Sequence, residues 1–191
     1  MYLLVGLGNP GSKYKKNRHN VGHIAIDMII KKYNFRKKNK NKFGDVFEGE
    51  LSNKKIFTLK PKEFMNLSGV SIKKFLDFYK INIKKLLVIH DDIDLPLGKI
   101  KIKIGGGNGG HNGLESIDNY IGKKYNRIRI GIDHPGNKDL VTSYVLSKFS
   151  KIEEILIYTK LDIVTKYFKI IFSNSNLFLT RIAEEEKSNG F

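Results

Sequence analysis

The sequence contains a histidine, a carboxylate and three carboxamides whose residue types could serve a hydrolytic site. They are His19, Asp91, Asn9, Asn66 and Asn112. A histidine can take a proton from water, and a carboxylate on its second ring nitrogen fixes the tautomer and stabilises the positive charge that forms. Carboxamides donate and accept hydrogen bonds without carrying charge. These residue types make His19 a candidate general base that Asp91 could orient, if the fold brings them together.

Other interpretations of these residues stay open. Asn9 precedes Pro10-Gly11 and suits a turn, while Asn66 and Asn112 each suit a helix cap. The acidic residues at 91, 92 and 94 could instead form a magnesium site. The glycine-rich stretch 105–113 lacks the Lys-Ser/Thr ending of a P-loop and the spacing of a dinucleotide-binding motif, so it indicates a turn that lets the backbone approach a ligand.

Three basic residues occupy ordered positions on predicted strands. Lys101 and Lys103 alternate with isoleucines and therefore share one face of a strand, and Arg129 lies in a second alternating strand. A guanidinium can hold a phosphate with two hydrogen bonds. These residues are candidates for binding a phosphorylated ligand.

The elements that must position these residues alternate between strands and helices, which predicts an α/β fold with a mixed sheet. Apolar runs or alternation predict strands near 2–7, 46–51, 56–59, 86–89, 100–104 and 128–132. Helical spacing predicts helices near 21–29, from the N-cap candidate Ser68 to about 79, near 114–121 and from Ser150, where Ser150 and Glu153 form a capping box. The helix after Ser150 carries the apolar residues Ile152, Ile155, Leu156, Ile163, Tyr167, Ile170 and Ile171, and we expect a final short helix after the break at 173–176. We expect one globular domain over residues 1–191, a twisted mixed sheet flanked by helices. Functional residues of such sheets gather beyond the carboxyl ends of the strands.

The composition excludes several classes of protein. The chain has 191 residues, no cysteine and a formal net charge of +16. The missing cysteines exclude a disulfide framework and a thiolate metal site, and no apolar run reaches the length of a membrane span. We see no signal peptide and expect a soluble, cytoplasmic protein without a membrane partner. The charge permits nucleic-acid binding, but only five of the 35 basic residues are Arg, and joint enrichment in Lys, Ile and Asn is also typical of an AT-rich genome.

Five sequence blocks resemble the bacterial peptidyl-tRNA hydrolase family. The blocks are Gly6–Gly22, Phe64–Gly69, His90–Gly98, Gly109–Leu114 and Arg127–Gly136. They keep the family's order and approximate spacing over residues 1 to about 150, whereas the segment 150–191 is similar only in being helical. Five co-linear blocks are far more specific than a single glycine-rich loop.

The resemblance implies a metal-independent hydrolase without a cofactor, which cleaves the ester between a peptidyl group and the 3′ ribose of tRNA. It implies that His19 is the base, that Asp91 stands behind it, and that Asn9 distinguishes blocked from free aminoacyl-tRNA. Asn66 and Asn112 are expected to hold the peptide and the ester, with Tyr14 and Phe64 lining the groove. Lys103 and Arg129, with Lys101 beside them, are expected to bind the 5′-phosphate of the tRNA. We expect a monomer whose partner is peptidyl-tRNA.

The same resemblance makes His90, His111 and His134 structural neighbours of the site rather than the base. Asn17 and Glu115 depart from the family pattern without touching the proposed catalytic set. Two rival functions are an RNA-binding protein without catalytic activity, since relatives with this fold assist intron splicing, and a generic nucleotide-binding domain. Intact His19 and Asp91 argue against the first rival. The missing P-loop argues against the second.

Overall fold

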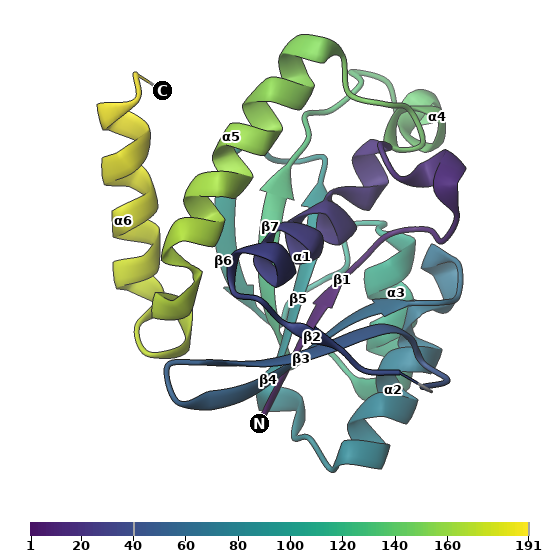
Figure 1. Ribbon diagram of the computed structural model, residues 1–191. Helices are drawn as coiled ribbons and strands as arrows, with labels where there is room; N and C mark the ends of the chain where they lie inside the picture. Colours follow the sequence, from purple (N-terminus) through teal and green to yellow (C-terminus); the bar gives the residue numbers. More distant parts are fainter. Residues whose placement is uncertain (40, 191) are drawn as a thin grey trace.

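The protein is a three-layered α/β structure in which one twisted sheet separates two groups of helices (Figure 1). The computed structural model describes residues 1–39 and 41–190; residues 40 and 191, the latter being the end of the predicted domain, lie outside it. The expected α/β class and mixed sheet are confirmed.

Seven strands form the sheet in the order β2-β3-β4-β1-β5-β7-β6. Their bounds are Tyr2–Gly6 (β1), Arg36–Lys37 (β2), Gly44–Leu51 (β3), Lys54–Pro61 (β4), Leu86–Asp92 (β5), Ile100–Ile104 (β6) and Asn126–Gly131 (β7). The four central strands β4, β1, β5 and β7 are parallel, and the outer strands pair antiparallel. The carboxyl ends of the central strands therefore meet at one edge of the sheet, where the predicted site residues follow them.

Helices cover both faces of this sheet. Their bounds are Val21–Lys32 (α1), Ser68–Tyr79 (α2), Asn112–Ile121 (α3), Val141–Val145 (α4), Lys151–Tyr167 (α5) and Ser175–Ser188 (α6). Helices α1, α5 and α6 contribute to the apolar cluster on one face, and α2 and α3 contribute to the cluster on the other. Along β1, Leu4 faces the first cluster, while Leu3 and Val5 face the second. This alternation follows from the two-residue period of a strand.

The C-terminal helices differ in detail from the sequence prediction. The capping box of Ser150 and Glu153 is confirmed at the start of α5. Ile152, in the first turn, is however 82% exposed, because the buried face of α5 runs through Ile157, Leu161 and Val164. The final helix, α6, packs along α5 and spans 14 residues, which is longer than the short helix that the sequence suggested.

Two predicted boundaries also change. The hairpin turn between β3 and β4 contains only Ser52 and Asn53, both with positive φ, so the strands are longer than predicted. Ser68 does not cap α2 with its side chain; its hydroxyl donates to the carbonyl oxygen of Met65 at 2.9 Å. Both differences arise at turns, where local hydrogen bonding decides the boundary.

A pair of glycines brings the start of α1 directly against the sheet. A Cβ added at Gly22 would lie 2.4 Å from the carbonyl oxygen of Ile89 in β5, and one added at Gly6 would lie 2.3 Å from the carbonyl oxygen of Gly22. Only glycine fits such a close approach of backbones. This contact fixes the 3-10 turn Arg18–Asn20, which precedes α1 and carries His19, beside the carboxyl end of β5.

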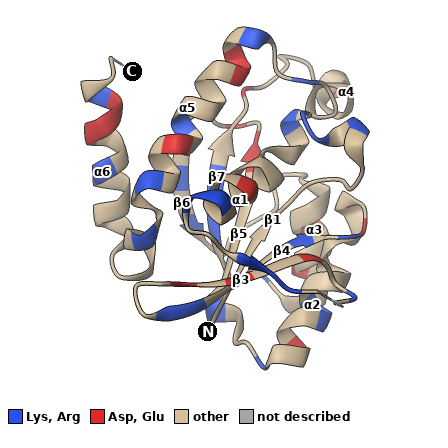
Figure 2. Cartoon of the chain, in the orientation of Figure 1, with Lys and Arg blue, Asp and Glu red and all other residues tan. Residues whose placement is uncertain are grey.

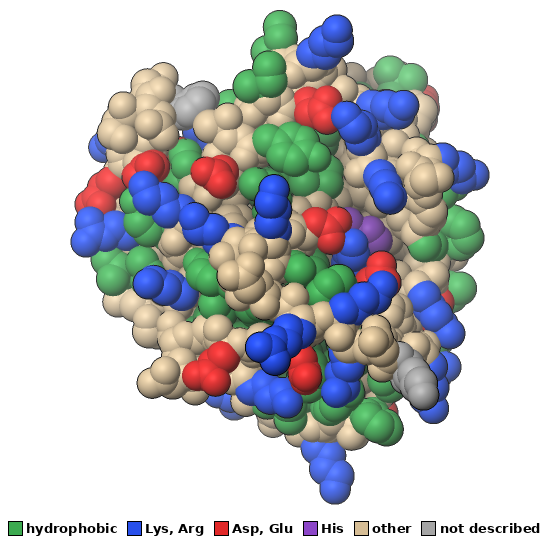
Figure 3. Space-filling model, in the orientation of Figure 1, with side chains coloured by type: hydrophobic (Ala, Val, Ile, Leu, Met, Phe, Trp, Pro, Cys, Tyr) green, Lys and Arg blue, Asp and Glu red, His purple; other side chains and the backbone are tan. Residues whose placement is uncertain are grey.

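Positive charge is spread over the molecule. Lys and Arg occur on helices and strands throughout the chain, and on the face shown in Figure 3 they alternate with acidic and apolar side chains (Figures 2 and 3). Within the described residues, no helix is long and apolar enough to cross a lipid bilayer. The net charge therefore identifies no binding surface by itself, and the position of individual cations becomes decisive.

Candidate active site

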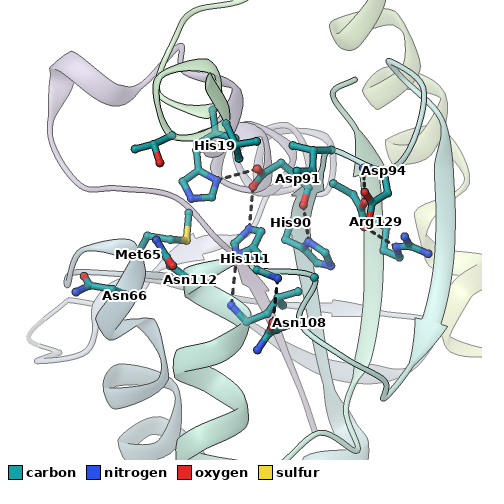
Figure 4. Close-up of a pocket in the computed structure, with 18 of the residues that line it drawn as sticks. His19, Met65, Asn66, His90, Asp91, Asp94, Asn108, His111, Asn112 and Arg129 are labelled. Carbon is teal, nitrogen blue, oxygen red and sulfur yellow. Dashed lines mark hydrogen bonds and ion pairs between the residues drawn. The ribbon is translucent and has the colours of Figure 1, made fainter. Parts of the chain in front are cut away.

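A cavity of about 920 Å³ opens at the carboxyl edge of the sheet and contains most of the predicted site residues (Figure 4). Loops after β1, β4 and β5 form one side, while the glycine-rich loop, β6, β7 and α4 form the other. Of the ten residues predicted from the sequence, eight line it: Asn9, His19, Phe64, Asn66, Asp91, Lys103, Asn112 and Arg129. Tyr14 and Lys101 are absent from this lining.

His19 and Asp91 are joined by a short hydrogen bond. His19 Nδ1 lies 2.7 Å from Asp91 Oδ2, and the two side chains are only 9% and 2% exposed. An ionised carboxylate can only accept, so Nδ1 carries the proton and donates it. The second nitrogen of His19, Nε2, is left with a lone pair. The ring is thus oriented as a proton acceptor.

His111 binds the other oxygen of the same carboxylate. His111 Nε2 lies 3.0 Å from Asp91 Oδ1, while His111 Nδ1 accepts from the backbone N–H groups of Gly113 and Leu114 at the start of α3. These two N–H donors leave Nε2 as the protonated nitrogen of a neutral ring. Asp91 therefore receives one hydrogen bond from each histidine. Sequence reasoning ranked His111 low; its place directly before a helix was the signal for this capping role.

The charge of Asp91 sets the protonation of the pair. Burial lowers the pKa of His19, but the charge of Asp91 and the hydrogen bond to it raise it by more, so the pKa lies above its usual value. Burial raises the pKa of Asp91, yet the two histidines lower it well below the usual range. Asp91 thus remains a carboxylate. His90, buried next to it, has a pKa lowered to about 3 by burial and by the neighbouring His111, so its ring accepts a proton less readily than His19.

Hydrogen bonds to Asn20 and Met65 hold Asn9 in place, and its NH₂ group has no partner among the residues that the structure describes. Its backbone N–H donates to Asn20 Oδ1 at 3.0 Å, and Asn20 Nδ2 donates to the Asn9 carbonyl at 2.9 Å. Asn9 Oδ1 accepts from the backbone N–H of Met65 at 2.9 Å. Because the side-chain oxygen is engaged, the amide nitrogen is the group left to donate toward the cavity. Asn9 is therefore more than a turn residue.

The other carboxamides and the aromatic pair lie around this centre. Asn66 and Asn112 are exposed, and neither side chain caps a helix: α3 is capped by His111, and no side chain caps the 3-10 turn that contains Asn66. The helix-cap interpretation of these two residues is thus wrong. Phe64 is 53% exposed, and its ring meets that of Tyr14 edge-on at 6.1 Å. Tyr14 thus contacts a lining residue without itself belonging to the cavity lining.

The predicted phosphate-binding residues divide into two groups. Lys103 and Arg129 line the cavity, whereas Lys101 stands opposite Arg129 in the β6–β7 register and outside the cavity lining. Arg129 Nε donates to Asp92 Oδ2 at 2.6 Å. This ion pair was not predicted from the sequence, because Asp92 and Arg129 become neighbours only when β5 and β7 pair.

A buried arginine holds the glycine-rich loop and was also missed. Arg127 Nη1 and Nη2 donate to the carbonyl oxygens of Gly107 and Gly106 at 2.8 and 3.0 Å, and its side chain is only 2% exposed. The loop that it anchors contributes residues 107–110 to the cavity wall. The alternation of charged and apolar residues in β7 was the available signal, but it did not show that this cation points inward.

Within residues 1–39 and 41–190, the acidic side chains at 91, 92 and 94 are not brought together as a close-set group of metal donors, the arrangement that the magnesium alternative requires. Asp91 is bonded to two histidines, Asp92 to Arg129 and to the backbone N–H of Asp94, and Asp94 is exposed. Among the described residues, the close-set donors are instead His19, Asp91 and His111, whose donor atoms lie within 4.8 Å of one another. Their mutual hydrogen bonds use two histidine nitrogens and both carboxylate oxygens, so a cation would have to displace these bonds.

This geometry is that of a hydrolytic enzyme with a histidine base, an orienting carboxylate and a nearby carboxamide donor. The family model described as peptidyl-tRNA hydrolase matches residues 3–189, which includes the C-terminal helices. The chain is 43% identical over 189 residues to a peptidyl-tRNA hydrolase of Bartonella henselae, covering 98% of each chain. It is 48% identical over 175 residues to one of Rickettsia bellii, covering 91% of this chain and 95% of the relative.

A solved structure agrees with this assignment. The crystal structure of peptidyl-tRNA hydrolase from Acinetobacter baumannii superimposes with a TM-score of 0.89 at 38% identity, covering 95% of this chain and 94% of that one. The chain belongs to the peptidyl-tRNA hydrolase family.

Proposed function

We propose that this protein hydrolyses the ester bond between a peptidyl group and the 3′ ribose of tRNA, and so returns tRNA from prematurely released peptidyl-tRNA. Family membership over nearly the whole chain supports the reaction. The observation that carries the mechanism is the 2.7 Å contact between His19 and Asp91, both of which line the cavity.

In the proposed reaction, His19 Nε2 takes a proton from a water molecule as the water oxygen attacks the ester carbonyl carbon. The bond to the ribose 3′ oxygen then breaks, and the imidazolium returns the proton to that oxygen. Asp91 stabilises the imidazolium and keeps its own negative charge throughout. The free NH₂ group of Asn9 donates to the carbonyl oxygen as negative charge develops there. No residue changes its net protonation over the cycle.

Substrate binding is assigned to the rest of the cavity. Asn66 and Asn112 supply hydrogen bonds to the peptide and the ester, and Phe64, backed by Tyr14, supplies an apolar wall. Lys103 and Arg129 bind the 5′-phosphate of the tRNA, which fixes the distance from the end of the acceptor stem to His19. Lys101 adds charge outside the cavity. We further propose that the enzyme is cytoplasmic and monomeric; light scattering of the purified protein would test the oligomeric state, and cell fractionation would test the location.

The direct test compares N-acetyl-aminoacyl-tRNA with unblocked aminoacyl-tRNA in the presence of a chelator. We expect release of the N-acetyl-amino acid at full rate with EDTA, and far slower release of the free amino acid, because Asn9 favours the blocked ester. Loss of activity with EDTA would contradict the metal-independent mechanism. Salt-sensitive tRNA binding without any cleavage would contradict the enzyme and favour the RNA-binding alternative.

A further inference from the structure

The guanidinium of Arg129 is held along one of its edges by Asp92. Arg129 Nε donates to Asp92 Oδ2 at 2.6 Å, and the side chains of Asp92 and Arg129 are only 12% and 22% exposed. In the described part of the chain, no protein acceptor bonds Nη1 or Nη2 of Arg129. The edge formed by these two nitrogens therefore remains available on a residue that lines the cavity.

Asp92 is itself fixed by the sheet and by the turn that follows it. It is the last residue of β5, paired with Gly131 of β7, and its carbonyl oxygen accepts from the backbone N–H of Ile132. Its second carboxylate oxygen, Oδ1, accepts from the backbone N–H of Asp94 at 3.0 Å. Asp92 therefore acts as a rigid support, with one oxygen on the turn and the other on Arg129.

The strand register places Asp92, Arg129 and Lys103 on one face of the sheet. Arg129 lies opposite His90, two residues before Asp92, so Asp92 and Arg129 are diagonal neighbours within reach of each other. Lys103 projects from β6 on the same side, since it stands opposite Arg127, two residues before Arg129. The free guanidinium edge and the Lys103 amine thus belong to one cavity wall.

We propose that Asp92 is the positioning residue of the phosphate-binding site: by occupying the Nε edge of Arg129, it determines that a terminal phosphate is bound by the Nη1–Nη2 edge, together with Lys103. This inference rests on the proposed 5′-phosphate site. A planar guanidinium can offer either edge to a phosphate, and the side chain that bears it has many rotamers. Asp92 removes one edge and most of the rotamers before the substrate arrives.

Neutralising Asp92 should change phosphate affinity in opposite directions, depending on whether Asp92 positions Arg129 or only contributes negative charge. The carboxylate of Asp92 repels a phosphate, so its neutralisation would tighten binding if charge were its only contribution. If Asp92 positions Arg129, neutralisation weakens binding instead. In Asp92→Asn the amide oxygen can still accept from the N–H of Asp94, but the NH₂ group then faces the Nε–H of Arg129 and cannot hold it.

The test compares kcat/KM for N-acetyl-aminoacyl-tRNA carrying a 5′-phosphate with that for the same tRNA after phosphatase treatment. We expect the wild type to favour the phosphorylated substrate roughly ten- to hundredfold, as for a charge-assisted pair of hydrogen bonds. Arg129→Ala should reduce this preference to near one. Asp92→Asn should reduce it to within about threefold by raising KM for the phosphorylated substrate, with little change toward the dephosphorylated one, which also controls for folding.

Asp94→Asn is the matched control, because it removes one negative charge from the same cavity, and in the described part of the chain no hydrogen bond or ion pair joins the Asp94 side chain to Arg129. It should leave the preference at the wild-type level or raise it slightly. The double variant Asp92→Asn with Arg129→Ala should behave like Arg129→Ala alone. An unchanged or increased preference in Asp92→Asn would overturn the positioning role. An unchanged preference in Arg129→Ala would instead overturn the phosphate site itself.

Discussion

At the residue scale, the functional unit is one carboxylate shared by two histidines with different tasks. Asp91 accepts from His19 through Oδ2 and from His111 through Oδ1. His111 cannot exchange its tautomer, because its Nδ1 already accepts from the backbone of α3. The only ring nitrogen of the pair left as a proton acceptor is Nε2 of His19. The chemistry of the site is therefore decided by hydrogen bonds and not by proximity alone.

Asp91→Asn should reveal this arrangement. Asparagine has one oxygen and one NH₂ group. Because the tautomer of His111 is fixed, its Nε2–H donates to the asparagine oxygen. The NH₂ group then faces His19 Nδ1 and forces the proton of His19 onto Nε2, the wrong position for a base. We expect kcat to fall roughly 10²- to 10⁴-fold, measured by single-turnover release of N-acetyl-amino acid.

Asp91→Asn should also shift the pH dependence of kcat/KM in a defined direction. The base must be neutral, so kcat/KM of the wild type rises with pH through the pKa of His19, which Asp91 raises. Removal of the charge leaves the effect of burial, which lowers the pKa. The residual activity of Asp91→Asn should therefore reach its plateau at a lower pH than that of the wild type. A plateau at the same pH would show that another group titrates.

At the element scale, the base depends on two attachments of the turn that carries it. One is the close contact of Gly6 and Gly22, which presses the start of α1 onto β1 and β5. The other is Arg18, directly before the base. Its Nη2 donates to both oxygens of Glu153 at 2.9 and 2.7 Å, and its guanidinium stacks on Tyr144 and Phe149. Arg18 thus connects the catalytic turn to α4 and to the first turn of α5.

Arg18→Ala should destabilise the protein and slow catalysis together. It removes a buried cation from its ion pair and leaves Glu153, a quarter exposed, without its partner. We expect a loss of about 2 kcal/mol in the free energy of unfolding in urea, with kcat lowered roughly tenfold or more because His19 is misplaced. Lys16→Ala is the control, since the ion pair of its exposed side chain with Glu154 should contribute little to the free energy of unfolding. Equal losses in the two variants would contradict the proposed attachment.

At the scale of the whole molecule, periodicity and turn residues predict the order and type of the elements. The central strand β5, for example, is evident as an uninterrupted apolar run because both its faces are covered. The buried face of α5 was assigned incorrectly, since Ile152 and Ile157 look alike in sequence and only packing decides between them. Composition alone could not place the positive charge, which is spread over the surface.

The sequence predicts the parts of the site that depend on the type of a single residue. His19 and Asp91 could be named because their residue types define the chemistry and the family motifs contain them. Two contacts could not be predicted: the ion pair of Asp92 with Arg129, which are 37 residues apart, and the bonds of Arg127 to the glycine-rich loop about 20 residues before it. Both depend on a strand register that exists only in the folded sheet. Cross-strand partners are invisible to a local sequence pattern.

The most direct test of the account is the turnover of N-acetyl-aminoacyl-tRNA by His19→Ala, with tRNA affinity measured on the same protein. We predict that turnover falls roughly 10²- to 10⁴-fold, as expected for loss of a general base, while the dissociation constant for tRNA changes less than about threefold, because the phosphate-binding residues are untouched. Turnover near the wild-type level would contradict the assignment of His19 as the base and, with it, the mechanism derived from its contact with Asp91.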